Sequence, residues 1–285
     1  MGTSGRTKGS QSGTPLIPTW LDEPQTGPLP GGDEDVSDGG NDAPDGQDDI
    51  VRPAIPLPPE PVRFQSARGN FSRFAGSGGN DRGALRRAVR DYVRSGTGGS
   101  GNAVRRMGGS RTAASNALGV FRGFQRDGVQ ETLRRLNLEN LAGRSLQDVF
   151  IGLTEVICRD GGSVDEAIAR DAWLETVAEL DRFGIEETPN SDQTCEVFLS
   201  FIAHTIEIRL YQEIGVKGFQ YAEDIANIEE FDSQFRSYIE RAVRDSFSSD
   251  LTKLSAMSDD DIKAVVDRTY HEAWDLLELL RDRER

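Results

Sequence analysis

Apolar residues in the C-terminal half of the chain recur at every third or fourth position, which is the spacing of one face of an α-helix. Runs of this kind cover residues 164–183, 190–210, 228–247 and 262–280. Residues 127–285 show none of the strict alternation that is typical of half-buried strands. The pattern predicts an all-α fold in which residues 127–285 form an acidic α-helical domain, a helical bundle.

Signatures of helix starts support this interpretation. A Ser followed three residues later by an acidic residue marks a helix N-terminus, because its hydroxyl caps a backbone N–H group. Such signatures begin at Ser145, Ser163 and Ser258, and the segment Pro189 to Asp192 opens a further predicted helix.

The preceding residues, 63–126, form an Arg-rich segment punctuated by glycines. Helical spacing predicts one helix over 81–94 and a second over 102–124, broken near Gly108, with a loop over 95–101 between them. Short helices are marginal alone, so we expect this segment to pack against something else.

Residues 1–62 are predicted to be a long disordered N-terminal tail, because Gly, Pro, Ser and Asp dominate and little apolar surface is available for burial. One apolar island, residues 14–21, is typical of a short docking motif stiffened by two prolines; packing back on its own domain is the alternative. A second island, residues 55–61, favours an extended polyproline spacer over a ligand for an aromatic groove. The predicted partner-docking residues are Leu16, Ile17, Trp20 and Leu21.

Charge is strongly segregated along the chain, whose net charge is −15. Residues 63–126 carry thirteen Arg and two Asp, whereas residues 127–285 carry a net charge of −18. Arginine without lysine favours bidentate recognition of phosphates or carboxylates. Nucleic acid, an acidic partner protein and the acidic half of the same chain all fit. The predicted basic interaction surface consists of Arg86, Arg87, Arg90, Arg94, Arg105, Arg106 and Arg111.

Patterns that would support catalysis are weak. Residues 96–101 match G-x-G-x-x-G, but an Arg-rich helix precedes them where the dinucleotide fingerprint requires a strand, so a connector is the better interpretation. The two histidines, His204 and His271, and the two cysteines, Cys158 and Cys195, lack zinc-site spacing. His204 is predicted to be a hydrogen-bonded helix residue. We therefore predict no catalytic residue, no metal, no cofactor and no enzymatic activity.

The N-terminal residues bear on the cellular location of the protein and on one reactive group, a glycine amine. The start of the chain lacks the apolar stretch of a secretory signal, and the chain has no apolar run long enough to span a bilayer, so a cytoplasmic protein without membrane contact is expected. Gly2 follows Met1 as a small penultimate residue. Removal of the initiator methionine would leave a free glycine amine with a reference pKa of about 8.

Several segments together resemble the QatB family, the B component of the bacterial Qat anti-phage defence system. The resemblance covers nearly the whole chain except for residues 27–50. The segments are Met1–Ser4, Thr14–Leu21, Asn70–Ala75, Tyr92–Gly99, Arg105–Gly108, Gly152–Cys158 and Asp165–Trp173.

This resemblance implies three partner proteins: QatA, a P-loop ATPase; QatC, similar to the QueC enzymes of deazaguanine synthesis; and QatD, similar to TatD nucleases. It implies a non-enzymatic subunit that docks on the ATPase. QueC-like enzymes of phage defence are linked to joining a deazaguanine to an N-terminal glycine, so the resemblance also implies Gly2 as a modification acceptor. The alternative is a nucleic-acid-binding adaptor that uses residues 63–126.

Overall fold

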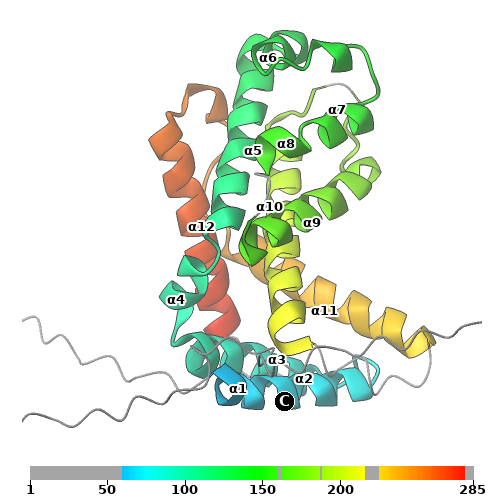
Figure 1. Ribbon diagram of the computed structural model, residues 1–285, viewed down its shortest axis with the longest axis vertical. Helices are drawn as coiled ribbons and strands as arrows, with labels where there is room; N and C mark the ends of the chain where they lie inside the picture. Colours follow the sequence, from blue (N-terminus) through cyan, green and yellow to red (C-terminus); the bar gives the residue numbers. More distant parts are fainter. Residues whose placement is uncertain (1–59, 159–161, 187, 216–224, 280–285) are drawn as a thin grey trace, which may run out of the picture. The chain divides into compact units, whose positions relative to one another are not determined.

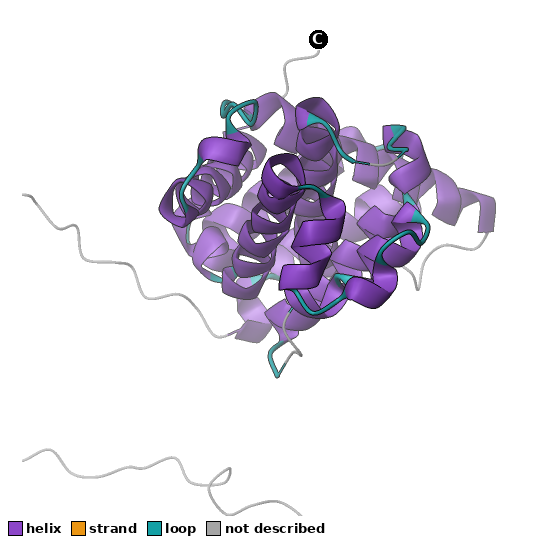
Figure 2. Cartoon of the chain, turned by 90° about the horizontal axis from the view of Figure 1, so that it is seen from above, coloured by secondary structure: helices purple, strands orange, loops and turns teal. Residues whose placement is uncertain are grey.

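The part of the chain that the computed structural model describes is helical throughout. It comprises residues 60–158, 162–186, 188–215 and 225–279, all within one compact unit. Figure 2 shows helices and connecting loops in these residues and no strand. The all-α prediction is therefore confirmed. Residues 1–59 of the predicted disordered tail lie outside the described residues, and the last three residues of that prediction, 60–62, are helical instead.

The elements follow one another with short connections (Figure 1). The α-helices are α1 (Glu60–Arg63), α2 (Gln65–Gly76), α3 (Arg82–Asp91), α4 (Ser100–Arg105), α5 (Gly108–Asp127), α6 (Val129–Arg135), α7 (Leu146–Gly152), α8 (Thr154–Ile157), α9 (Val164–Ala178), α10 (Ser191–Leu210), α11 (Ile225–Ser246) and α12 (Asp259–Leu279). The π-helical turns are η2 (Tyr92–Thr97) and η5 (Tyr211–Gly215), and the 3₁₀ turns are η3 (Glu139–Leu141), η4 (Leu180–Phe183) and η7 (Leu254–Ala256).

The helix starts predicted from capping signatures are confirmed. Ser145 caps α7 through the amide of Asp148, and Ser163 and Glu166 form a reciprocal capping box at α9. Asn190 forms a second capping box, with Gln193, at the start of α10. These contacts are local, which is why the sequence is sufficient to predict them.

The predicted loop over 95–101 is wrong in extent. Tyr92–Thr97 continue α3 as a π-helical turn, and only Gly98 and Gly99, both with positive φ, form the connection to α4. A tertiary contact requires glycine at position 96, because a Cβ built there would lie 2.5 Å from the ring of Phe64. This glycine therefore makes room for an aromatic side chain within the helical turn.

The long helices α5, α10 and α12 stand side by side in Figure 1, with α2 and α3 lying across the lower ends of α10 and α12. Helix α10 is the central element, buried along most of its length and packed against α5, α9 and α11. The apolar side chains of the Arg-rich segment belong to the same core. Phe64 stacks on Tyr92 with ring centroids 5.3 Å apart, and Tyr92 stacks on Trp274 of α12 at 5.6 Å.

The Arg-rich segment thus packs against the remainder of its own chain, because the rings on α2 and η2 have their aromatic partners on η5, α11 and α12. The boundary between residues 126 and 127 coincides with the end of α5 and does not separate two cores. In the described residues, no helix is long and apolar enough to cross a membrane.

Candidate interaction site

Three of the predicted surface arginines form ion pairs with distant parts of the same chain. The pairs are Arg94 with Glu278 at 3.0 Å, Arg106 with Glu213 at 2.8 Å, and Arg111 with Asp267 at 2.6 Å. Two of the carboxylates belong to α12 and one to η5. These arginines therefore link the Arg-rich segment to the acidic half of the same chain, which is one of the three partners that the sequence allows.

The other four predicted arginines lie on α3 and α4. Arg87 and Arg90 lie 3.8 Å and 3.7 Å from the carboxylates of neighbouring aspartates on α3 or at its N-cap. Arg105 is exposed and donates a hydrogen bond to Asn102, while the partly buried Arg86 acts electrostatically on Tyr238. At least five of the seven arginines therefore have a carboxylate of their own chain as partner.

A buried polar network fixes the start of α5 against α9 and α10. The Asp165 carboxylate accepts hydrogen bonds from the amides of Gly109 and Ser110 and, at 2.8 Å, from the Ser110 hydroxyl. Its Oδ1 also lies 2.7 Å from Nη2 of Arg209, which in turn donates to the Arg106 carbonyl. A negative charge at a helix N-terminus is favourable, so Asp165 both caps α5 and neutralises the buried arginine.

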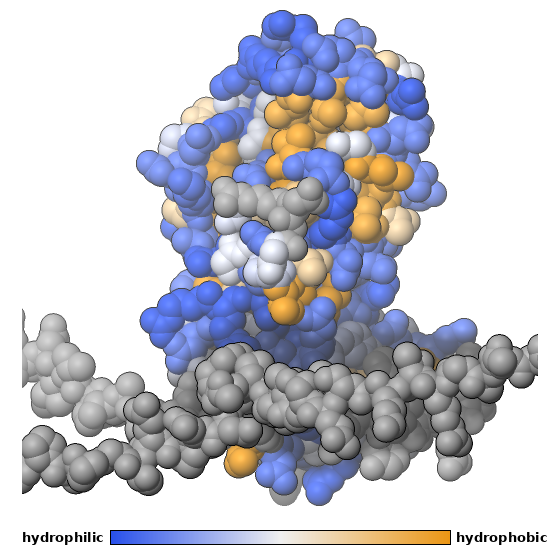
Figure 3. Space-filling view, viewed as in Figure 1, coloured by the Kyte–Doolittle hydropathy of each residue, from blue (hydrophilic) through white to orange (hydrophobic). Residues whose placement is uncertain are grey.

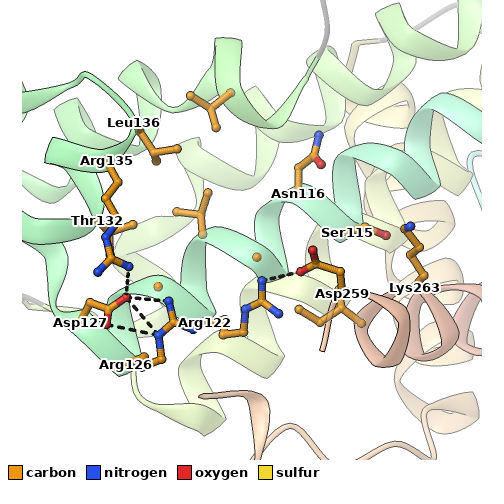
Figure 4. A pocket seen from close by; sticks show the side chains of 15 residues that line it. Ser115, Asn116, Arg122, Arg126, Asp127, Thr132, Arg135, Leu136, Asp259 and Lys263 are labelled. Atoms are coloured by element: carbon orange, nitrogen blue, oxygen red, sulfur yellow. Dashed lines mark hydrogen bonds and ion pairs between the residues drawn. The ribbon is translucent and has the colours of Figure 1, made fainter. Parts of the chain in front are cut away.

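A groove of about 410 Å³ runs along one face of α5, between α6, α8 and α12 (Figure 4). Its floor includes Ser115 and Gly119, one helical turn apart, and a Cβ built at Gly119 would meet nothing within 4 Å. Thr132 of α6 closes the groove at Gly123, where a Cβ would lie 2.8 Å from its methyl group. The apolar wall residues are Val120, Leu136, Val156 and Ile262.

Basic side chains rim the groove. Figure 4 shows Arg126 and Arg135 both directed at Asp127, with Nη2 of Arg126 at 2.9 Å and Nη1 of Arg135 at 2.6 Å from its carboxylate. Arg122 pairs with Asp259 at 2.5 Å, and Lys263 lies at the other end of the groove. The lining therefore holds four cations and two carboxylates, a positive balance within an acidic chain.

Apolar surface continues beside the groove. Figure 3 shows hydrophobic residues gathered over α7, α8 and the adjacent part of α9 on this face. Ile151 of α7 and Leu174 of α9 are exposed large hydrophobic residues, with side chains at 49% and 43% exposure. Apolar surface rimmed by charged residues is typical of protein-binding faces.

A second pocket, of about 380 Å³, lies between α9, α10 and α11 and contains His204 at its base. The two ring nitrogens of His204 each lie 3.5 Å from a carboxylate, of Glu179 and of Glu207. Burial alone would lower the pKa of His204, but hydrogen bonding to these two carboxylates outweighs burial and raises the pKa to about 9. The same contact lowers the pKa of Glu179 to about 2. His204 is thus a core helix histidine that faces two carboxylates.

The remaining predicted site residues cannot be placed. Gly2, the predicted modification acceptor, and the docking residues Leu16, Ile17, Trp20 and Leu21 lie outside the described residues.

Residues 98–277 match the family of Qat anti-phage system associated protein QatB. The chain belongs to the QatB family. No curated protein and no solved structure matches the chain. Membership confirms the resemblance seen in the sequence and makes this chain a component of the Qat anti-phage system.

The QatB match includes one candidate site in full and excludes most of another. Every lining residue of the groove falls between Ser115 and Lys263, inside the matched region. Four of the seven predicted arginines, on α3 and η2, lie before residue 98 and are excluded. The groove therefore lies within the region of this chain that matches the QatB family.

The sequence interpretation missed the groove residues. Their one visible signal is the spacing of Ser115, Gly119 and Gly123, small residues four positions apart on a predicted helix. Such spacing is equally typical of a helix face that packs closely inside the same chain, as Gly123 does against Thr132.

Proposed function

We propose that this chain is a non-enzymatic, cytoplasmic subunit of the Qat system that binds partner proteins and presents Gly2 for modification. Its principal partner is the QatA-like P-loop ATPase, and the QatC enzyme, which is QueC-like, acts on Gly2. The nuclease QatD, which is TatD-like, is a further partner. The observation that carries the proposal is the groove beside α5, which combines apolar walls and a basic rim within the QatB-matched region.

The helical body has the properties of a docking platform. Its long-range ion pairs and continuous core hold α5 and α12 in place, so the groove between them is preorganised. A preorganised surface loses less conformational entropy on binding. The apolar surface over α7 and α8 enlarges the area that a partner can cover.

The role of Gly2 rests on the sequence. Removal of Met1 leaves a glycine α-amine, the nucleophile that joining to a deazaguanine would require. The Gly2→Ala variant keeps a small penultimate residue and a free amine, whereas Gly5→Ala changes a nearby glycine and leaves the terminus intact.

The test is phage protection in cells that carry all four Qat genes. The proposal expects Gly2→Ala to abolish protection and Gly5→Ala to retain it, while both variants still co-purify with the ATPase. Full phage protection by the Gly2→Ala variant would contradict the acceptor role of Gly2. Failure of the wild-type chain to bind any Qat component would remove the subunit role.

The nucleic-acid adaptor is the weaker candidate, since most of the predicted arginines are paired with carboxylates of the same chain. It expects nucleic-acid binding that falls steeply with salt and that is lost when Arg86, Arg87, Arg105 and Arg106 become Ala.

A further inference from the structure

We propose that the groove along α5 receives an amphipathic helix of a partner protein, with its apolar stripe inside the groove and acidic side chains against the basic rim. This inference rests on the proposed function, because it specifies how the subunit binds its partner.

The shape of the groove favours a helix as occupant. The lining residues on α5 run from Ser115 to Asp127, twelve positions along one helix. At about 1.5 Å per residue this is roughly 18 Å, or a little over three turns. The missing side chain at Gly119 leaves open space over the helix backbone. Small residues at such a position allow two helix axes to approach closely.

The aliphatic walls of the groove favour an apolar stripe on the entering helix. Three aliphatic residues, Leu136, which follows α6, Val156 of α8 and Ile262 of α12, line the groove. Walls of aliphatic side chains with a glycine floor suit residues that recur every three or four positions on an entering helix.

The basic rim of the groove favours carboxylates on the partner helix. Arg126 uses Nε and Nη2 to bind Asp127, and Arg135 uses Nη1 for Asp127 and Nε for Glu131. A guanidinium carries five N–H donors, so the Nη1 group of Arg126 and the Nη2 group of Arg135 retain donors that no bond within the described residues uses.

Both arginine side chains are half exposed, at 53% and 50%. Asp127 and Glu131 already face these arginines, so the favourable charge that remains is modest. It orients the acidic flank of the partner helix, while the apolar walls provide most of the affinity.

The experiment measures binding of the purified chain to the purified Qat ATPase. Gly119→Leu fills the open space over α5, and Arg126→Gln with Arg135→Gln removes the rim charge. The matched control is Gly69→Leu, another mid-helix glycine whose Cβ would meet nothing within 4 Å, located on α2. Thermal melting confirms that each variant is folded.

We expect Gly119→Leu to weaken binding at least tenfold and Gly69→Leu to leave it unchanged. The wild-type affinity should fall between ~50 mM and ~300 mM salt, and the double arginine variant should lose most of this salt dependence. Equal binding by Gly119→Leu and the wild type would overturn the groove inference and leave the proposed function intact. No binding by the wild type would overturn both.

Photo-crosslinking from p-benzoylphenylalanine at Ser115 identifies the occupant. The inference expects the crosslinked ATPase peptide to carry apolar residues at helical spacing with Asp or Glu beside them. A crosslink to a basic peptide, to nucleic acid or to a second copy of this chain would contradict it.

Discussion

Replacing Asp165 with Ala is expected to cause a large loss of stability, because this carboxylate serves two elements at once. It caps the N-terminus of α5 through two backbone amides and neutralises Arg209, whose side chain is 7% exposed. Removing one partner of a buried ion pair costs about 3–5 kcal/mol of unfolding free energy. We expect a total loss in this range, of which the lost helix cap contributes ~1 kcal/mol. Arg209 keeps Glu213 at 3.3 Å, so its charge retains one partner in the variant.

Urea denaturation followed by circular dichroism measures this loss. With a slope of about 2–3 kcal/mol per molar urea, the midpoint should fall by roughly 1–2 M. Asp171→Ala is the matched control, since Asp171 is an exposed carboxylate on the same helix, and it should change stability by less than ~0.5 kcal/mol.

A double variant separates the lost ion pair from general disruption. Asp165→Ala combined with Arg209→Met removes both charges, so its destabilisation should be smaller than the sum of the two single changes. A midpoint shift below ~0.5 M for Asp165→Ala, or strictly additive effects, would refute the assigned role of this network.

Three further predictions follow from buried groups. The pKa of His204 in the folded chain, about 9, lies above its ordinary value of 6.5. The charged form of His204 therefore stabilises the fold fully below pH 6.5, and this contribution is lost as the pH rises through 9. The urea midpoint of the wild type should fall over this window, whereas that of His204→Gln should stay flat. Gly96→Ala should destabilise the fold by about 1–3 kcal/mol because its Cβ meets the Phe64 ring, whereas Gly119→Ala should stabilise it by up to ~1 kcal/mol; thermal melts of the two variants should move in opposite directions. Burial raises the pKa of Cys158 to about 12 and that of Cys195 to about 11, so neither thiol should react with a thiol reagent at pH 8 until urea unfolds the chain.

Features that depend on neighbouring residues were predictable from the sequence. The caps at Ser145, Ser163 and Ser258 and the helical runs that follow them arise within one or two turns of chain. The break between α4 and α5 lies at residues 106–107, next to the expected position at Gly108.

Features that depend on distant contacts were not predictable in this way. Gly96 has the sequence appearance of a loop residue, yet the Phe64 ring accounts for it. Arg94 and Arg111 have the appearance of a free basic surface, yet their partners lie more than 150 residues away on α12. The groove depends on how α6, α8 and α12 are placed around α5, which no local pattern encodes.

The intact mass of this chain shows whether the proposed binding subunit carries a modification on Gly2. The chain should be purified from cells with the complete set of Qat genes and from cells that lack the QueC-like enzyme, and its N-terminal peptide mapped. The account predicts a mass increase confined to Gly2 that depends on that enzyme. An unmodified N-terminal glycine in cells that are actively protected from phage would contradict it.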